Sequence, residues 1–314
     1  MLLAILLSAG PAAFAQTPER VYRLGMLSPS SAMIERLRAG VLPELVRLGF
    51  IEGQNLVFEA RSGTIEELPA LARELAARHP GVVMATGGLA IRAARQASDT
   101  IPIVGSFIGE DPIKADFATS LAHPGGVITG IAMLATDLER KRLQLLHDAV
   151  PGIRRVAALT PNALVASLAE AKEAADRLGV ELLPVSAETP GDYQAAFAAM
   201  RRAEADGLQI FSWPQFFTDA ASLAALALDA RLPTVCEWAE MARSGCLLGY
   251  GPDFTELQDK LAGYVARILR GTAPGELPIE EPTHYAFAIN LKTASALGLT
   301  IAPYMLGRAD EVIE

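Results

Sequence analysis

Short apolar runs alternate with longer amphipathic segments along most of the chain, the pattern typical of an α/β protein. The apolar runs predict strands at about 22–27, 55–60, 82–86, 102–107, 155–159, 181–185, 208–212 and 233–236. The amphipathic segments predict helices at about 32–48, 66–78, 89–97, 163–177, 192–204 and 219–230, and Pro43 should kink or restart the first of them. Helical connections of this length join parallel strands.

The same motifs occur twice in the same order. Residues 23–30 and 155–162 are both an apolar run that ends in Ser-Pro-Ser or Thr-Pro-Asn, and Ser28 and Thr160 lie 132 residues apart (160 − 28). The Leu-Gly pairs at 48–49 and 178–179 differ by 130 residues (178 − 48). This repeat predicts two Rossmann-like lobes, and a cleft between two lobes is a common place for a small ligand.

A third segment, 246–314, has no counterpart at this offset. It predicts a strand at 247–251, a helix at 257–268, a proline-rich linker, a strand at 285–289 and a helix at 291–297, with Asn290 as N-cap and Gly298 as stop. Turn-rich junctions near 123–130, 249–252 and 274–283 predict three crossings between the lobes, a hinge that closes on a ligand. We expect an N-terminal lobe of 21–127 plus about 252–283, and a C-terminal lobe of about 131–249 plus about 285–314.

Composition narrows the function. The chain has 314 residues, 51% of them hydrophobic and 20% charged, which is sufficient for two domains with proper cores. The net charge of −9 argues against a nucleic-acid partner, which would need a basic face.

Residues 1–15 differ from the rest because they carry no charge. The apolar run Leu2–Leu7 and the small residues around Phe14 predict a signal peptide cleaved near Ala15-Gln16, and the segment is too short to span a bilayer. No Lys or Arg precedes the apolar run, so either the start codon is assigned late or the leader is unusual. The alternative is an apolar N-terminus of a cytosolic protein.

No catalytic, metal or cofactor motif is present. The chain lacks a G-x-S-x-G elbow, a phosphate-binding loop and an H-E-x-x-H pair, and none of its four histidines is spaced as a metal ligand. Cys236 and Cys246 are the only cysteines. An oxidising compartment would permit a disulfide between them, but we favour two small buried thiols.

The candidate site residues follow the ends of the predicted strands, where ligands of open parallel sheets bind. They are Ser28, Ser30, Thr86, Gly87, Gly88, Ser106, Phe107, Asp111, Thr160, Asn162, Ser212, Trp213, Phe216, Glu237 and Trp238. Helix N-termini after Ser30, Gly88 and Asn162 would offer N–H donors to a carboxylate.

Several of these residues also have a structural interpretation. Ser28, Ser30, Thr160 and Asn162 could be helix caps only, and Gly87-Gly88 could be only a tight turn. The tryptophans could be core residues, and Phe216 could pack beneath the next helix. Glu237 would need a cationic group on the ligand, or a neighbouring arginine, to be tolerated in a closed cleft.

Several segments together resemble one group of ABC-transporter substrate-binding proteins. They are Leu-Gly-Phe-Ile-Glu-Gly-Gln-Asn-Leu at 48–56, Asp-Pro at 111–112, the run 120–130, Gly-Tyr-Gly-Pro-Asp at 249–253, and the ending at 289–299 and 308–313. The resemblance implies a type I periplasmic binding protein with two α/β lobes and three crossings, which delivers a solute to a membrane permease and ATPase. Relatives with known ligands include binders of aromatic amino acids and related carboxylates. The chain departs from its relatives at Val127, at Pro43 and at Cys236-Glu237-Trp238, the last being where ligand contacts are expected.

The sequence therefore predicts a secreted, monomeric, non-enzymatic protein of the periplasm. It would capture a small carboxylate or an amino acid, including aromatic ones, by hinge closure, without a cofactor. The alternatives are a ligand sensor that presents its closed form to a receptor, and a hydrolase that uses a serine or Glu237 in the cleft.

Overall fold

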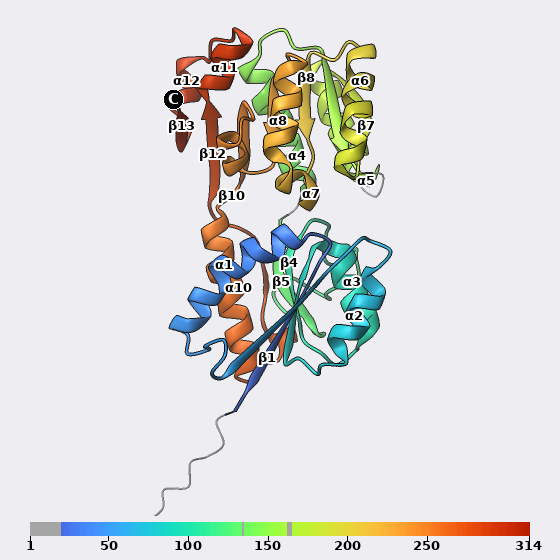
Figure 1. The fold of residues 1–314 in the computed structure, drawn as a ribbon, viewed down its shortest axis with the longest axis vertical. Helices are drawn as coiled ribbons and strands as arrows, with labels where there is room; N and C mark the ends of the chain where they lie inside the picture. Colours follow the sequence, from blue (N-terminus) through green and yellow to red (C-terminus); the bar gives the residue numbers. More distant parts are fainter. Residues whose placement is uncertain (1–19, 134, 162–164) are drawn as a thin grey trace, which may run out of the picture.

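Two α/β lobes lie one above the other along the long axis of the molecule (Figure 1). The structure is a computed structural model that describes residues 20–133, 135–161 and 165–314. The predicted leader and Asn162 lie outside the described residues.

Each lobe contains one sheet covered by helices on both faces. The first lobe contains β1 (Tyr22–Ser28), α1 (Ser31–Arg47), β2 (Leu56–Ser62), α2 (Leu68–Ala76), β3 (Val82–Thr86), α3 (Gly87–Ala97), β4 (Ile103–Ile108), β5 (Ile128–Ala132), α10 (Phe254–Leu269), a 3-10 turn η3 (Pro274–Glu276) and β11 (Ile279–Glu280). The second lobe contains α4 (Ala135–Ala149), β6 (Arg155–Thr160), α5 (Val165–Leu178), β7 (Glu181–Ser186), η2 (Pro190–Asp192), α6 (Tyr193–Arg202), β8 (Gly207–Ile210), α7 (Pro214–Thr218), α8 (Ala220–Asp229), β9 (Thr234–Cys236), α9 (Ala239–Arg243), β10 (Leu248–Pro252), β12 (Tyr285–Asn290), α11 (Leu291–Leu297), α12 (Pro303–Leu306) and β13 (Glu311–Ile313).

The two sheets repeat one strand order. The first is β2-β1-β3-β4-β5-β11 and the second is β7-β6-β8-β9-β10-β12-β13. The described strand pairs are parallel apart from β10 with β12, which is antiparallel. The predicted α/β class with parallel sheets is confirmed. Because β10 takes the place of β5, the segment after residue 246 does begin with a counterpart in the first lobe.

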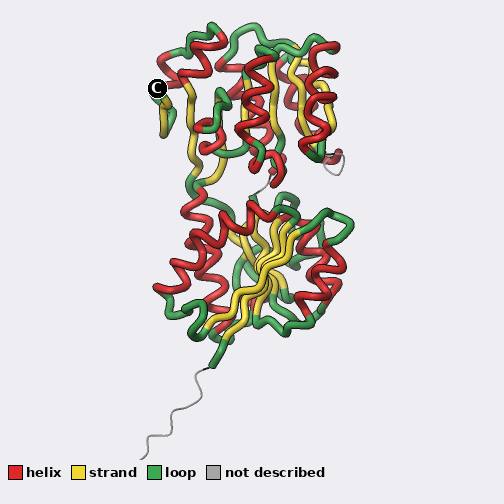
Figure 2. The backbone as a smooth tube through the Cα atoms, in the orientation of Figure 1, coloured by secondary structure: helices red, strands yellow, loops and turns green. Residues whose placement is uncertain are grey.

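The chain passes between the lobes three times: after β5, between β10 and α10, and between β11 and β12 (Figure 2). The first passage comes later than the boundary expected at 127, because β5 pairs with β4. Gly130 explains the difference. Its φ is +141°, and a Cβ there would lie 2.0 Å from the carbonyl oxygen of Gly105. This glycine therefore permits a close approach between strands, whereas the sequence indicated a turn.

Helix α1 runs unbroken through Pro43, against the expected kink or restart. A proline removes the hydrogen bond to the carbonyl four residues earlier, here that of Ala39, and Ala39 is exposed. The buried stripe of Leu37, Val41 and Leu45 lies on another face of the helix and continues past the proline. At the other end of the chain, Asn290 accepts a hydrogen bond from the N–H of Thr293, so the predicted N-cap of α11 is confirmed.

Candidate ligand-binding cleft

A cavity of about 340 Å³ lies between the lobes, at the carboxyl ends of strands from both sheets. Its volume is within the range of small-molecule sites. The first lobe and the crossing after β5 line it with Pro29, Met33, Thr86, Gly87, Gly88, Leu89, Arg92, Phe107, Gly109, Glu110 and Met133. The second lobe lines it with Glu139, Phe211, Ser212, Trp213, Pro214, Glu237 and Trp238.

The cavity brings together many of the residues predicted from strand ends. Those that line it are Thr86, Gly87, Gly88, Phe107, Ser212, Trp213, Glu237 and Trp238. Ser28, Ser30, Ser106, Asp111, Thr160 and Phe216 do not line it.

Most of the six serve the backbone or the core. Ser30 caps α1 by accepting a hydrogen bond from the N–H of Met33, and Ser28 accepts one from the N–H of Ser30. Asp111 accepts hydrogen bonds from the N–H groups of residues 113 and 114. Ser106 lies 3.2 Å from the hydroxyl of Thr86, and Thr160 borders a separate hollow beside β7. Phe216 is buried against Tyr193, with the ring centroids 6.2 Å apart.

The wall from the first lobe begins with the start of α3. Gly87 has a φ of +76°, a conformation that favours glycine, and a side chain there would project into open space. Thr86 does not cap the helix with its side chain. The first N–H donors of α3 at the cavity wall are therefore not satisfied by a side-chain cap.

An ion pair that the sequence reasoning missed stands in the same wall. Arg92 Nη2 lies 2.7 Å from Glu110 Oε2, and the arginine side chain is 42% exposed. Burial raises the pKa of Glu110, and the charge of Arg92 opposes that rise. The spacing of Gly88 and Arg92, one helical turn apart on α3, could have indicated that this arginine faces the cleft.

The second lobe holds a buried charged network behind its wall. Glu139 Oε1 accepts hydrogen bonds from Arg142 Nη1 and from the N–H and hydroxyl of Ser212, while its Oε2 accepts one from Gln209. Arg142 also donates to the carbonyl oxygens of Tyr250 and Glu237. Both ion-pair partners are essentially inaccessible, at 0% and 1% exposed. The network fixes the loops that follow β8 and β9, because it bonds to the main chain of both.

Glu237 follows β9 and is buried in the cavity wall. Burial raises the pKa of its carboxyl to about 7, and the negative charge of Glu139 acts in the same direction. The positive charge of Arg142 and the hydroxyl of Ser212 act in the opposite direction without restoring the ordinary value. Arg142 donates to the main-chain oxygen of Glu237, and no ion pair to its carboxyl is present within the described residues.

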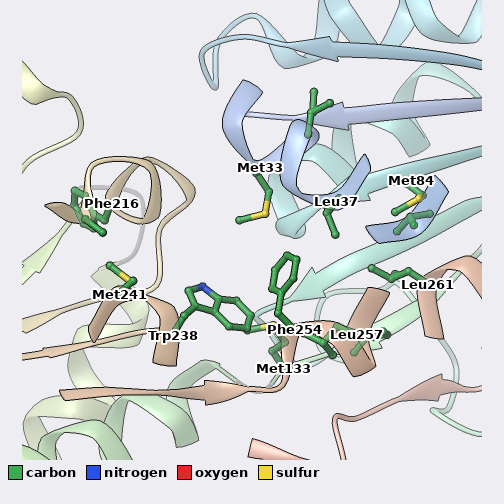
Figure 3. Close-up of a cluster of buried hydrophobic side chains, with 14 of the residues drawn as sticks. Met33, Leu37, Met84, Met133, Phe216, Trp238, Met241, Phe254, Leu257 and Leu261 are labelled. Carbon is green, nitrogen blue, oxygen red and sulfur yellow. The ribbon is translucent and has the colours of Figure 1, made fainter. Parts of the chain in front are cut away.

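Aromatic rings from both lobes meet at one side of the cavity. Trp238 from the second lobe packs edge-on against Phe107 from the first, with the ring centroids 5.7 Å apart. It packs in the same way against Phe254, also from the first lobe, at 5.3 Å (Figure 3). Trp238 is 1% exposed, and its indole Nε1 makes no hydrogen bond with the described residues. Phe107 has a φ of +61°, which is strained for an aromatic residue, so the surrounding structure must hold its ring in place.

The lobes also meet through Arg36 on α1. Its Nη2 lies 2.8 Å from Glu240 Oε1 on α9, and its guanidinium covers the rings of Phe254 and Phe217 at 3.4 and 4.0 Å. Burial lowers the pKa of Arg36, and Glu240 opposes that change. Arg36 is therefore a contact that exists only while the lobes are together.

Cys236 and Cys246 form a disulfide, so the expected pair of free thiols is wrong, although both residues are fully buried. Their Cα atoms lie 6.5 Å apart because β9 and β10 are neighbouring strands. The loop that the bond closes carries Glu237, Trp238 and α9.

No helix within 20–133, 135–161 and 165–314 is long and apolar enough to cross a membrane. The same ranges hold no cluster of three or more acidic, histidine or cysteine side chains that could bind a metal ion.

Comparisons with known proteins agree with this architecture. The family model described as ABC transporter substrate binding protein matches residues 30–313. The search of curated proteins found no match.

Solved structures show the same fold. A conserved domain protein from Vibrio cholerae is 23% identical with a TM-score of 0.85, covering 93% of this chain and 100% of its own. An ABC domain in complex with L-Trp from Streptococcus pneumoniae is 19% identical with a TM-score of 0.83 and the same coverage. A solute binding protein with bound allitol from Agrobacterium vitis is 14% identical with a TM-score of 0.62, covering 92% of this chain and 99% of its own. The predicted type I periplasmic binding protein fold is confirmed.

Proposed function

Because the chain belongs to the ABC transporter substrate binding protein family, we propose that it is the periplasmic solute-binding component of an ABC importer. One observation carries the proposal: the cavity is lined by strand ends of both lobes, so a ligand in it would contact both. Such a ligand favours the closed form, because the open form offers it only one wall. The closed form would then dock on the membrane permease and its ATPase.

The chemistry of the walls favours a small ligand with an apolar or aromatic part. Phe107, Phe211, Trp213 and Trp238 line the cavity beside the start of α3. Helix N-terminal N–H groups suit a carboxylate, and aromatic rings suit an apolar body. The structural neighbour with bound L-Trp supports an aromatic amino acid or a related carboxylate as the ligand.

The protein acts without chemistry on its ligand in this proposal. Glu139 is committed to Arg142, and the serine that lines the cavity, Ser212, bonds to that same carboxylate. The hydroxyl of Ser212 is therefore directed at a carboxylate that is already ion-paired, and an ion-paired carboxylate is a weak base for activating a nucleophile.

Intrinsic fluorescence tests binding directly, because both tryptophans of the chain line the cavity. Titration with L-phenylalanine, which does not obscure tryptophan emission, is expected to change the spectrum saturably. The Trp213→Phe variant should retain the response of Trp238. A ligand at 100 times its Kd should also stabilise the fold by about 2.7 kcal/mol. Unchanged emission and melting temperature across a panel of amino acids and small carboxylates would refute the ligand class.

Transport requires its own measurement. Uptake of the labelled ligand by cells that lack the gene should fall and recover on complementation. Normal uptake in the deletion strain, with a lost response to the ligand, would favour a sensing role.

A further inference from the structure

Three carboxyl groups line the cavity, and they differ in how their charge is compensated. Glu110 has Arg92 at 2.7 Å, and Glu139 has Arg142 at 2.8 Å. Glu237 is buried, with only 8% of its surface exposed, and yet it has no ion-pair partner within the described residues. Two of the three carboxyl groups in the cavity wall are therefore neutralised by an arginine, and the carboxyl group of Glu237 is not.

The arginines near Glu237 are committed to other groups. Arg142 donates through Nε, Nη1 and Nη2 to Tyr250, Glu139, Ser212 and the main-chain oxygen of Glu237. Arg36 pairs with Glu240 on α9 through Nη2, and its buried Nη1 has no hydrogen-bond partner among the described residues. The charge of Arg36 is therefore already matched by Glu240, and Arg142 cannot turn to the Glu237 carboxyl without breaking hydrogen bonds that are already made.

A buried carboxylate without a cation is costly, and a protonated amine would supply the missing charge and its hydrogen bonds. We propose that Glu237 binds a cationic amine of the ligand, so that the natural ligands are amines or zwitterions with an apolar or aromatic body. The inference rests on the proposed function, because it assumes that the ligand occupies this cavity. It selects amines from the wider class of small carboxylates and amino acids.

The groups around Glu237 give the expected pH dependence. Glu139 and Arg142 face it from α4, Arg36 from α1, and Ser212 and Trp238 from the flanking loops. Burial raises the pKa of Glu237 to about 7, so the ionised fraction rises about fivefold between pH 6 and pH 7. An α-amine stays protonated over that interval. Amine affinity should therefore rise about fivefold in the wild type and stay flat in Glu237→Gln.

Isothermal titration with three probes that share a phenyl ring tests the proposal. They are 2-phenylethylamine, 3-phenylpropanoate and L-phenylalanine, which carry an amine, a carboxylate and both. The wild type should bind both amines, and Glu237→Gln should weaken each at least tenfold without weakening 3-phenylpropanoate. Glu59→Gln is the matched control, because Glu59 is a partly buried, ion-paired carboxyl that does not line the cavity.

The outcomes separate this inference from the function on which it rests. If 3-phenylpropanoate binds the wild type as tightly as the amines, or Glu237→Gln keeps amine affinity within twofold, the solute-binding role stands and the amine assignment fails. If no probe binds and the ligand that co-purifies with the native protein is a neutral or anionic compound, the amine assignment fails and so does the proposed aromatic class. Circular dichroism of Glu237→Gln checks that the variant is folded.

Discussion

The two lobes share one strand order but present different chemistry to the cavity. The first lobe contributes a threonine hydroxyl, the glycine start of α3 and a half-exposed ion pair between Arg92 and Glu110. The second contributes a buried carboxyl in front of a buried charged network. The repeated fold therefore sets where the walls stand, and the few residues at each strand end set the chemistry of each wall.

Burial also decides how much each charged pair contributes to stability. An ion pair that remains in contact with water gains little, whereas removing one partner of a buried pair leaves a charge without compensation. We therefore expect that removing the arginine of an ion pair lowers the free energy of unfolding several-fold more in the second lobe than in the first.

Replacement of the buried arginine should have the largest effect. Arg142→Met is expected to lower the free energy of unfolding by about 3–5 kcal/mol, because Glu139 stays buried without its cation. Arg92→Met in the first lobe should cost about 1 kcal/mol or less, since that pair is half exposed. Urea unfolding of both variants measures the contrast, and equal losses would contradict the asymmetry.

The disulfide should come next. Cys236→Ser combined with Cys246→Ser should destabilise the protein by about 2–3 kcal/mol, because the bond closes a short loop in the second lobe. Melting curves with and without a reducing agent give the comparison. The wild type should lose stability on reduction while the double variant does not respond, and a wild type indifferent to the reductant would argue against the bond.

Glu237 should reduce the stability of the empty protein as pH rises. Its folded pKa of about 7 lies above the ordinary 4.5, so the folded state holds a proton that the unfolded state releases. Stability is therefore lost between pH 4.5 and about 7, and Glu237→Gln should avoid the loss. At pH 8 this variant should exceed the wild type by about 3 kcal/mol, because a pKa difference of about 2.5 units corresponds to about 1.4 kcal/mol per unit, and the two should be equally stable at pH 4. A wild-type advantage at pH 8 would mean that Glu237 already has a cationic partner.

The contact between lobes should show the smallest effect. Arg36→Met should weaken the closed form by about 1 kcal/mol, since the bond to Glu240 is partly exposed. Small-angle scattering of the ligand-free protein should report a larger radius of gyration. Arg38→Met is the control, because its partner Glu52 is in the same lobe and both are exposed. An equal change of the radius of gyration in both variants would show that Arg36 does not hold the lobes together.

Local patterns predicted most of the architecture. Buried runs such as β3 and amphipathic segments such as α10 carry their own periodicity, so their positions followed from the sequence within a few residues. Strand β5 was missed because glycine at position 130 reads as a turn, although it serves a close strand contact. Its counterpart β10 begins 120 residues later (248 − 128), and this shorter offset hid the match.

The site was predictable only in part, for a physical reason. Residues at or just after strand ends, such as Thr86, Ser212 and Glu237, reach the cavity because parallel strands end at one edge. The bonds of Arg142 join it to residues 70 to 108 positions away, which no local pattern encodes. The disulfide likewise depends on the pairing of β9 with β10.

A crystal structure of the protein with L-phenylalanine would test the account most directly. We expect the ligand in the cavity between the lobes, with its amine within hydrogen-bond distance of the Glu237 carboxyl and its ring beside Trp213 or Trp238. A ligand bound outside this cavity, or one that contacts a single lobe, would contradict it.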